Sequence, residues 1–455
     1  MKNKFQKSDG QVDLFLTPLE RICSEEHPLC VLAKKIEWDF FDSKFGDLFH
    51  ENMGRPASRT RLVVGLHFLK AMYNESDESV VQKWIENPYW QYFCGEVNFQ
   101  YKWPIDPTTM NKWRKRVKAE GFEELFHSTI EAALKTGVLR KIDFEKIIVD
   151  TTVQEKAVTF PTDAKLYHKM RERLVKEGKV LNVQLRRTYK KSSKSALIMQ
   201  GRYRHARQMK RANREVRRLR VMMGAVRRDL DRKTKNSERS ERLKNLLELS
   251  ERLFNQKRED KSKIYSLHAP EVECIAKGKA HKKYEFGCKV GFVTSSRSNF
   301  ILGVKAFHGN PYDGHTLQKS LDQVNQFLPE NTSLKDVYVD KGYKGHGVTN
   351  LNVYMDQKKS KKHTKSMWKW ILRRAAIEPV IGHMKNDGGA KRNHLLGKQG
   401  DEINAMMMAI GQNLRKIFKS FSNLYDFLSF EQVKAEINLF TCQIQFVNNQ
   451  GFVKN

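Results

Sequence analysis

The sequence predicts an α/β fold class: a mixed sheet that carries helices, with a helical region before it and a long basic helical segment inserted into it. Three observations carry this prediction. Apolar residues recur at helical spacing between residues 58 and 136, strand-like runs lie between residues 284 and 340, and a basic helical pattern fills residues 163–280. A chain of 455 residues is long enough for two or three domains.

The first helical region, residues 58–136, is expected to be a compact module. Apolar side chains three and four residues apart mark its first helix: Leu62, Leu66, Leu69 and Met72. A later helix is expected to begin with Asp106 as its N-cap and Pro107 at its first position. The pattern breaks at Asn87 and Pro88, which is compatible with a helix-turn-helix, and a plain helical bundle explains the pattern equally well.

The first strand is expected over residues 147–153. After the basic segment, apolar residues alternate with glycine or charged residues and predict a half-buried strand: Tyr284, Phe286, Cys288, Val290 and Phe292. A turn and residues 300–307 complete a hairpin, a further strand leads to Asp340, and LNVYM adds another. These strands predict a mixed sheet.

Two helices are expected to pack on this sheet. GNPYDGHTLQKSLDQVNQFL predicts the first, in which Asn310, Asp313 and His315 could reach a metal. Asp313 is preferred as the helix N-cap, with Thr316 as an alternative. The second is INAMMMAIGQNLRKIF, whose apolar residues at helical spacing predict a core helix.

The basic segment contains a heptad seam: Met209, Ala212, Val216, Leu219, Met223, Val226 and Leu230. A second helix is expected to cover it in an antiparallel hairpin, through Leu243, Leu246, Leu247 and Leu253. Residues 186–233 hold 18 Lys or Arg and 3 Asp or Glu, so they carry +15 of the net charge of +32. Contact with phosphate is the favoured interpretation, and a solvated charged face is the alternative.

Composition narrows the function classes. The charge of +32 and the pI near 9.8 indicate a polyanionic partner. No apolar run approaches the roughly 18 residues of a membrane span, and the N-terminus lacks a secretory core, so we expect a soluble intracellular protein. The six scattered cysteines lack zinc spacing and are expected to be reduced. No phosphate-binding glycine loop is present, which argues against an ATP-driven motor.

Two aspartates stand where buried strands are expected to end. Asp150 follows the apolar residues 147–149, and Asp340 closes the strand before a loop with two glycines. Carboxylates at neighbouring strand ends suit Mg2+, and a pair of metals about 3.5 to 4 Å apart can activate an attacking oxygen and stabilise the leaving one. A turn or cap residue is the commoner explanation for either aspartate alone.

Glu378 is the candidate third acid. On a helix, Arg374, Glu378 and Lys385 lie at offsets of four and seven residues and share one face. Pro379 is expected to kink this helix and so to aim Glu378. A surface salt bridge would explain Arg374 and Glu378 by themselves, but the combination of three acids in a basic chain favours a metal site.

The order Asp150, Asp340, Glu378, with the motif R-x3-E-x6-K, resembles the DDE transposases of bacterial insertion sequences, in the group related to insertion sequences four and five. The phrases VDTTVQEKAVTFPTDAKL, VDKGYKGH and RRAAIEPVIGHMKNDG look like sequence blocks of that group. The resemblance spans about residues 50–425.

This resemblance implies a ribonuclease H-like fold, with strand cleavage and strand transfer at terminal inverted repeats. Asp150, Asp340 and Glu378 would hold two Mg2+ ions, with Mn2+ able to substitute, and Arg374 and Lys385 would contact phosphates near the scissile bond. Water would be the first nucleophile and a freed 3′-hydroxyl the second. The implied partners are double-stranded DNA, both terminal repeats and target, and a second copy of the chain at synapsis, on the nucleoid in the bacterial cytoplasm.

Four further basic residues are expected to contact DNA: Arg217, Arg218, Lys112 and Arg114. The expected domains are a 1–56 arm, a 57–140 helical DNA-binding domain, a 141–430 catalytic domain interrupted by the 163–280 insertion, and a 431–455 tail. For the insertion, DNA clamping or dimer contact is weighed against a solvated spacer.

The chain departs from the group at two points. Ile371 stands where the group often has a tyrosine, and the large insertion precedes the second acid, since Asp150 and Asp340 are 190 residues apart but Asp340 and Glu378 only 38. Three alternatives stay open: a same-fold nuclease that never joins DNA ends, a non-catalytic architectural DNA-binding protein, and an inactive transposase copy.

Overall fold

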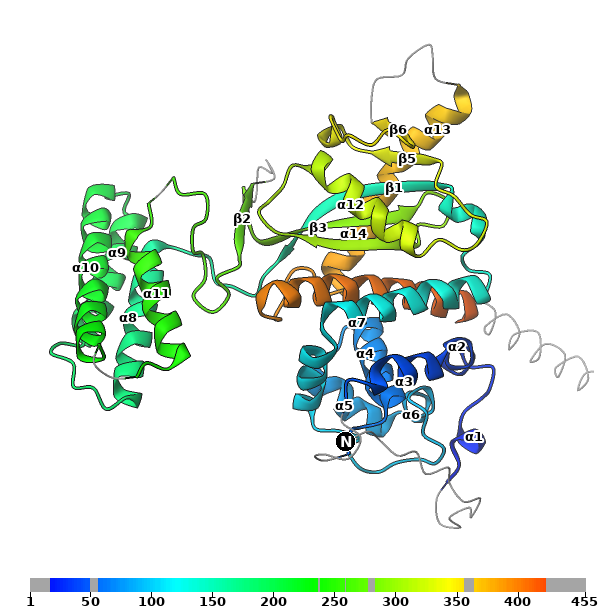
Figure 1. The fold of residues 1–455 in the computed structure, drawn as a ribbon, viewed down its shortest axis with the longest axis horizontal. Coiled ribbons are helices and arrows are strands. Elements are labelled where there is room, and N and C mark those ends of the chain that lie inside the picture. Colours follow the sequence, from blue (N-terminus) through cyan, green and yellow to red (C-terminus); the bar gives the residue numbers. More distant parts are fainter. Residues whose placement is uncertain are drawn as a thin grey trace, which may run out of the picture.

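The computed structural model describes residues 17–49, 56–235, 238–257, 259–276, 283–355 and 364–422. Helices from the first third of the chain lie below a sheet with its own helices, and a bundle of helices stands to one side (Figure 1). None of the described helices is long and apolar enough to cross a membrane. The expected tail and Cys442 lie outside the described residues, and the other five cysteines are free thiols.

The helices predicted between residues 58 and 136 are confirmed. The N-terminal elements are α1 (Leu19–Ile22), α2 (Pro28–Lys35), α3 (Trp38–Gly46), α4 (Thr60–Tyr73), α5 (Asp77–Glu86), α6 (Pro88–Phe93) and α7 (Pro107–Lys135). Asp106 caps α7 as predicted, accepting a 2.9 Å hydrogen bond from the Thr108 N–H. Asn87 separates α5 from α6. The apolar core of these helices continues without a break into the core under the sheet.

The sheet is mixed, as predicted. Its strands are β1 (Lys146–Glu155), β2 (Glu273–Ala276), β3 (Tyr284–Ser295), β4 (Ile301–Phe307), β5 (Asp336–Val339) and β6 (Asn352–Met355). The order is β2-β3-β1-β5-β6, with β4 also paired to β3. β1, β5 and β6 run parallel, whereas β3 is antiparallel to β1, β2 and β4.

Three predictions about the strands are wrong. Asp150 does not close its strand, because β1 continues to Glu155 through its pairing with β3. β3 is not half-buried: apart from its first residues it is buried on both faces, since strands flank it on both edges and helices cover it. The basic insertion does not extend to residue 280, because β2 already belongs to the sheet.

The remaining helices pack around the sheet. They are α12 (Asp313–Gln326), the 3-10 turns η2 (Lys341–Tyr343) and η3 (Arg374–Ala376), α13 (Lys365–Arg373), α14 (Ile377–Asp387) and a helical run over residues 397–422. Where the kink was predicted, the α-helix is interrupted by the 3-10 turn η3, and Pro379 beyond it has no N–H to donate back to Ala375. The run over 397–422 is core, as predicted: Ile403, Met407, Ile410, Leu414 and Ile417 are buried.

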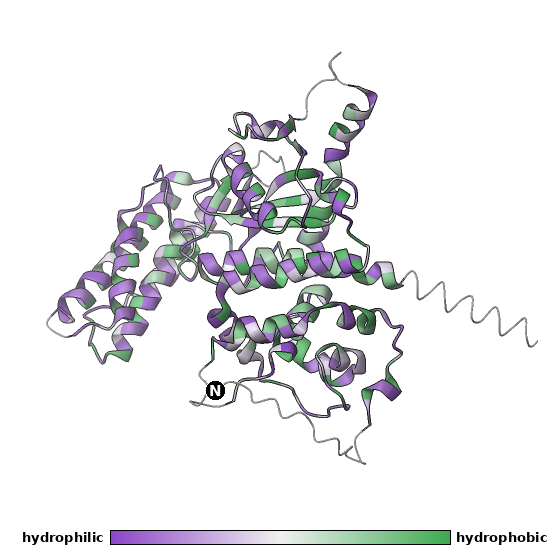
Figure 2. Cartoon of the chain, turned by 45° about the vertical axis from the view of Figure 1, so that its right-hand side comes forward, coloured by the Kyte–Doolittle hydropathy of each residue, from purple (hydrophilic) through white to green (hydrophobic). Residues whose placement is uncertain are grey.

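The insertion is a four-helix bundle rather than a hairpin. It consists of α8 (Asp163–Val180), α9 (Lys190–His205), α10 (Met209–Lys233) and α11 (Glu241–Asn255). Along the seam on α10, Val216 is half-buried and Met209 is exposed, whereas the other members are buried: Ala212, Leu219, Met223, Val226 and Leu230. α11 covers this seam as predicted, but α8 and α9 pack on α10 more extensively. The bundle has its own apolar core, and hydrophilic residues dominate the rest of it (Figure 2).

Candidate active site and nucleic-acid interface

Asp150 and Asp340 lie at corresponding positions of neighbouring parallel strands. Val149 in β1 pairs with Val339 in β5, so each aspartate directly follows one member of that pair. Each carboxylate accepts a hydrogen bond from the backbone N–H of the residue that follows it. The Thr151 N–H donates to Asp150 Oδ1 and the Lys341 N–H donates to Asp340 Oδ1, both at 2.7 Å. Parallel pairing therefore brings together two acids that are 190 residues apart in the chain.

Glu378 lies on α14, which packs against β1, the strand that contains Asp150. Its Oε1 lies 3.6 Å from Arg374 Nη2, and its side chain is 63% exposed. Lys385, on the same helix, contacts a different acid. Its Nζ lies 3.6 Å from Glu285 Oε1, and Glu285 is buried in β3.

The donor chemistry of these acids fits a hard cation, since carboxylate oxygens are the ligands that Mg2+ prefers. Two of them are neighbours through strand pairing, and the third lies on a helix that contacts the same strand. Within the described residues, no group of three or more His, Cys, Asp or Glu side chains is yet close enough to hold a metal ion. Glu378 would have to turn from Arg374 toward the two aspartates to complete one.

Asp313 is a polar group of this site that the sequence interpretation placed wrongly. The N-cap of α12 is Tyr312, and Asp313 occupies the first helical position. Its Oδ1 accepts hydrogen bonds from Thr151 Oγ1 and Lys289 Nζ, both at 2.9 Å. Asp313 therefore contacts the residue next to Asp150 and does not cap its own helix.

Tyr343 lies behind the two aspartate segments and is 1% exposed. Burial raises the pKa of its phenol well above the ordinary value, and the negative charges of Asp150 and Asp313 raise this pKa further. Tyr343 therefore stays protonated at neutral pH and can only act as a neutral packing or hydrogen-bonding group.

A buried ion cluster holds the far end of β1. Lys156 Nζ lies 2.9 Å from Glu271 Oε1 and 2.8 Å from Asp401 Oδ1. Asn393 Nδ2 also donates to Asp401 Oδ1, at 2.7 Å. The cluster joins β1, the exit from the bundle and the helical run over 397–422, and sequence reasoning missed it because its members are far apart in the chain.

Comparison with known proteins gives two matches to protein families. Residues 17–116 match a family described as "Transposase domain (DUF772)", and residues 256–414 match one described as "Transposase DDE domain". The chain is also 48% identical over 201 residues to "Uncharacterized protein ORF8 in nfe locus" of Rhizobium meliloti. These aligned residues cover 44% of this chain and 97% of that protein. No solved structure matches the chain.

The chain belongs to the insertion-sequence DDE transposases. The DDE match in this transposase contains Asp340 and Glu378, whereas Asp150 and all four helices of the bundle lie between the two matched stretches. The insertion thus separates the first acid of the transposase from the other two, as the spacing predicted.

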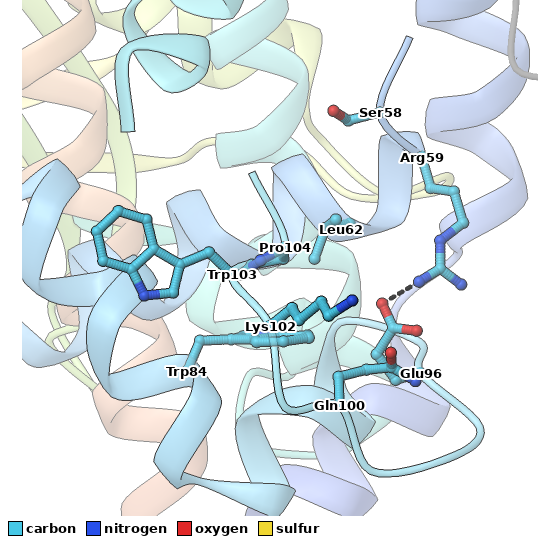
Figure 3. Close-up of a pocket in the computed structure, with 9 residues that line it drawn as sticks. All are labelled: Ser58, Arg59, Leu62, Trp84, Glu96, Gln100, Lys102, Trp103 and Pro104. Carbon is cyan, nitrogen blue, oxygen red and sulfur yellow. Dashed lines mark hydrogen bonds and ion pairs between the residues drawn. The ribbon is translucent and has the colours of Figure 1, made fainter. Parts of the chain in front are cut away.

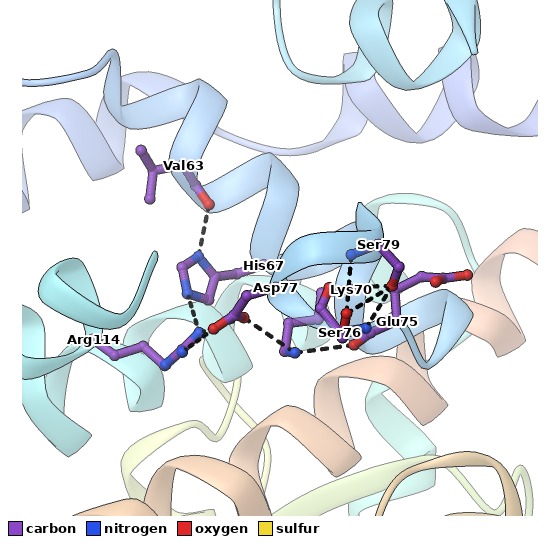
Figure 4. Close-up of polar contacts among 8 residues, drawn as sticks. All are labelled: Val63, His67, Lys70, Glu75, Ser76, Asp77, Ser79 and Arg114. Atoms are coloured by element: carbon purple, nitrogen blue, oxygen red, sulfur yellow. Dashed lines mark hydrogen bonds and ion pairs between the residues drawn. The ribbon is translucent and has the colours of Figure 1, made fainter. Parts of the chain in front are cut away.

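Arg114 of the transposase was predicted to contact DNA, but it is buried among the N-terminal helices. Arg114 is 5% exposed, and its guanidinium binds the carboxylate of Asp77 through two nitrogens and also contacts His67 (Figure 4). Arg114 therefore connects α7 to α4 and α5, and the prediction that it contacts DNA is wrong. The prediction failed because Asp77 lies 37 residues away.

The contacts in this cluster change the pKa values of two residues, His67 and Asp77. Burial, and then the Arg114 charge, lower the pKa of His67 from 6.5 to about 3, and the His67 Nδ1–H donates to the Val63 carbonyl at 2.7 Å. Burial alone would raise the pKa of Asp77, but Arg114 and Lys70 outweigh it and lower that pKa to about 2. His67 is neutral and Asp77 is charged at neutral pH.

Three of the other predicted DNA contacts of the transposase are on the surface. Lys112, Arg217 and Arg218 are exposed, and Arg218 lies 3.4 Å from Glu215. Arg374 is mostly covered, with 13% of its side chain exposed. α10 carries ten Lys or Arg and three Asp or Glu, and α9 carries five Lys or Arg and no Asp or Glu. α11 carries three of each, so the charge of the bundle is concentrated on α9 and α10.

A surface depression of about 400 Å³ lies in the N-terminal helices, away from the three acids. It lies between the start of α4 and the loop before α7, where Arg59 forms an ion pair with Glu96 (Figure 3). Trp103 on that loop is 56% exposed. None of the predicted site residues lines this depression.

Proposed function

We propose that this transposase binds the terminal inverted repeats of its insertion sequence and catalyses Mg2+-dependent strand cleavage and strand transfer. The observation that carries the proposal is the register Val149 with Val339, which makes Asp150 and Asp340 neighbours. The strand order and directions also support a ribonuclease H-like fold for the sheet, with antiparallel β4, β3 and β1 followed by parallel β5 and β6.

In this proposal Asp150, Asp340 and Glu378 hold two Mg2+ ions, with Mn2+ able to substitute. Such a metal pair, when bound, activates the attacking oxygen and stabilises the leaving one. The protein positions the carboxylates through β1, β5 and α14. Arg374 Nη2 lies 3.6 Å from Glu378 Oε1, and in this proposal its guanidinium contacts a phosphate near the scissile bond. Lys385 would have to leave Glu285 for the same role.

The basic face of α10 is proposed as a contact for the DNA backbone. Lys210, Arg214 and Arg217 lie at offsets of four and seven residues, so they share one helical face, and all three are exposed. None of the three forms an ion pair with another described residue. Cations in this state are free to replace the counterions of phosphates. Arg218, beside them, adds to the same surface.

The domain roles follow from these proposals. Residues 57–140, with exposed Lys112, would bind the terminal repeat, and residues 141–430 outside the bundle would carry catalysis. Two DNA ends have to be paired before strand transfer, so a homodimer at synapsis is proposed as well.

A cleavage and joining assay separates this proposal from its alternatives. The purified transposase is mixed with labelled duplex carrying the terminal repeats and with a supercoiled target, in Mg2+ or in chelator. We expect Mg2+-dependent nicks at the repeat tips, followed by joining to the target. Cleavage without joining would indicate a nuclease, and binding without cleavage would indicate an architectural protein or an inactive copy.

A further inference from the structure

The first turn of α12 contacts both segments that carry the proposed catalytic aspartates. Asp313 Oδ1 accepts a 2.9 Å hydrogen bond from Thr151 Oγ1, and Thr151 directly follows Asp150. The other oxygen of the same carboxylate, Oδ2, would lie 3.3 Å from a Cβ atom placed on Gly342, two residues after Asp340. One carboxylate therefore lies between the two acid-bearing segments.

Two further contacts join this turn to the loop after Asp340. The Tyr312 hydroxyl donates to the Lys344 carbonyl at 3.0 Å. A Cβ atom on Gly314 would lie 3.3 Å from the Tyr343 carbonyl oxygen, so backbone approaches backbone here. Because Tyr343 is buried and η2 contacts α12, this loop is packed against the start of α12.

Lys289 completes the arrangement from β3. It is 8% exposed, and its Nζ donates to Asp313 Oδ1 at 2.9 Å and to the Pro311 carbonyl at 2.6 Å. Its charge compensates the carboxylate of Asp313, and with Thr151 it gives Oδ1 two donors. An oxygen with two donors is poorly available to a cation, which distinguishes Asp313 from the three proposed ligands.

We propose that Asp313 is a positioning residue of the transposase: its carboxylate, held by Lys289, fixes the segments of Asp150 and Asp340 relative to each other through Thr151 and the loop at Gly342. This inference rests on the proposed function. A displacement of about 1 Å in reacting groups can cost on the order of 100-fold in rate, so a brace between two ligand segments has a measurable effect.

The test is a double-mutant cycle with Asp313→Ala and Thr151→Val. Repeat-end cleavage is measured at saturating DNA, and Mn2+ binding without DNA is measured by electron paramagnetic resonance. We expect Asp313→Ala to cleave about 100-fold more slowly, to bind Mn2+ more weakly and to bind repeat DNA normally. Because the effect passes partly through Thr151, the double variant should lose clearly less than the product of the two single losses. Fully multiplicative losses would overturn the proposal.

A rescue variant separates positioning from metal binding. Asp313→Asn combined with Lys289→Met keeps an oxygen that accepts from Thr151 and leaves no buried ammonium without its partner. We expect this variant to recover cleavage and Mn2+ affinity to within about 10-fold of wild type, whereas a variant as defective as Asp313→Ala would identify Asp313 as a ligand and overturn the proposal. Failure of the wild type to cleave would overturn the proposed function, but wild-type cleavage matched by Asp313→Ala would overturn this inference alone.

Discussion

At the scale of single residues, the polar groups buried between the N-terminal helices set how the transposase responds to acid. His67 is fully buried and its pKa is lowered from 6.5 to about 3. As the pH falls below 6.5, the unfolded chain takes up a proton on this histidine and the folded chain does not. Stability is therefore lost as the pH falls, over the range between the two pKa values.

This loss of stability with falling pH gives a prediction for His67→Phe, a variant that keeps a ring against Trp113 and Phe122 but cannot titrate. Wild type should lose about 2 kcal/mol more than the variant between pH 7 and pH 5, as measured by urea unfolding at both values. His383→Phe is the matched control because this histidine is exposed on α14. An equal loss in wild type and in His67→Phe would contradict the prediction.

Lys156 gives a second prediction at this scale. Its side chain is 2% exposed and is the only cation within ion-pair distance of Glu271 and Asp401 among the described residues. Lys156→Met would leave two buried carboxylates without their cation, so we expect a loss of about 3 to 5 kcal/mol in the free energy of unfolding at pH 7. Lys165→Met, at an exposed position on α8, should stay within about 0.5 kcal/mol of wild type.

Sequence reasoning proposed as metal ligands the residues whose signal is local. Asp150 and Asp340 each end a short apolar run, and Glu378 lies in a spaced motif. It misplaced Asp313 and Arg114, because the decisive partners, Thr151 and Asp77, lie 162 and 37 residues away. A local pattern cannot distinguish an N-cap from a long-range acceptor, or an exposed arginine from a buried one.

At the scale of elements, patterns gave the identity of most helices and strands but not their surroundings. The cap at Asp106 and the break at Asn87 were predictable, because they depend on neighbouring residues. The burial of β3 on both faces depends on strands and helices from elsewhere in the chain. For the same reason α8 and α9 could not be identified as the main partners of α10.

A close helix contact provides the prediction at this scale. A Cβ atom on Gly411, in the helical run over 397–422, would lie 2.2 Å from the Ala71 carbonyl of α4. Gly411→Ala should therefore force the helices apart and cost about 1 to 3 kcal/mol of unfolding free energy. Gly382→Ala on α14 meets no atom within 4 Å and should be neutral or stabilising by up to about 1 kcal/mol. Equal thermal stability of the two variants would argue against the close packing.

At the scale of the whole molecule, the basic residues of the bundle predict that it contacts the phosphates of DNA. Replacing Lys210, Arg214 and Arg217 by Gln should weaken binding to DNA of any sequence and reduce the slope of log K against log salt by about 3. The matched control replaces Lys244, Arg252 and Lys257, which are exposed on or just after α11. Equal slopes for the two triple variants would favour a solvated spacer.

The central claim concerns the pair of aspartates that parallel pairing brings together. The most direct measurement is repeat-end cleavage in Mg2+ by wild type, Asp150→Asn, Asp340→Asn and the exposed-site control Asp322→Asn, with binding of the same DNA measured in parallel. The account predicts that both Asp150→Asn and Asp340→Asn bind the repeat normally but cleave it about 1,000-fold more slowly or worse, while Asp322→Asn cleaves like wild type. Cleavage at the wild-type rate by either Asp150→Asn or Asp340→Asn would contradict it.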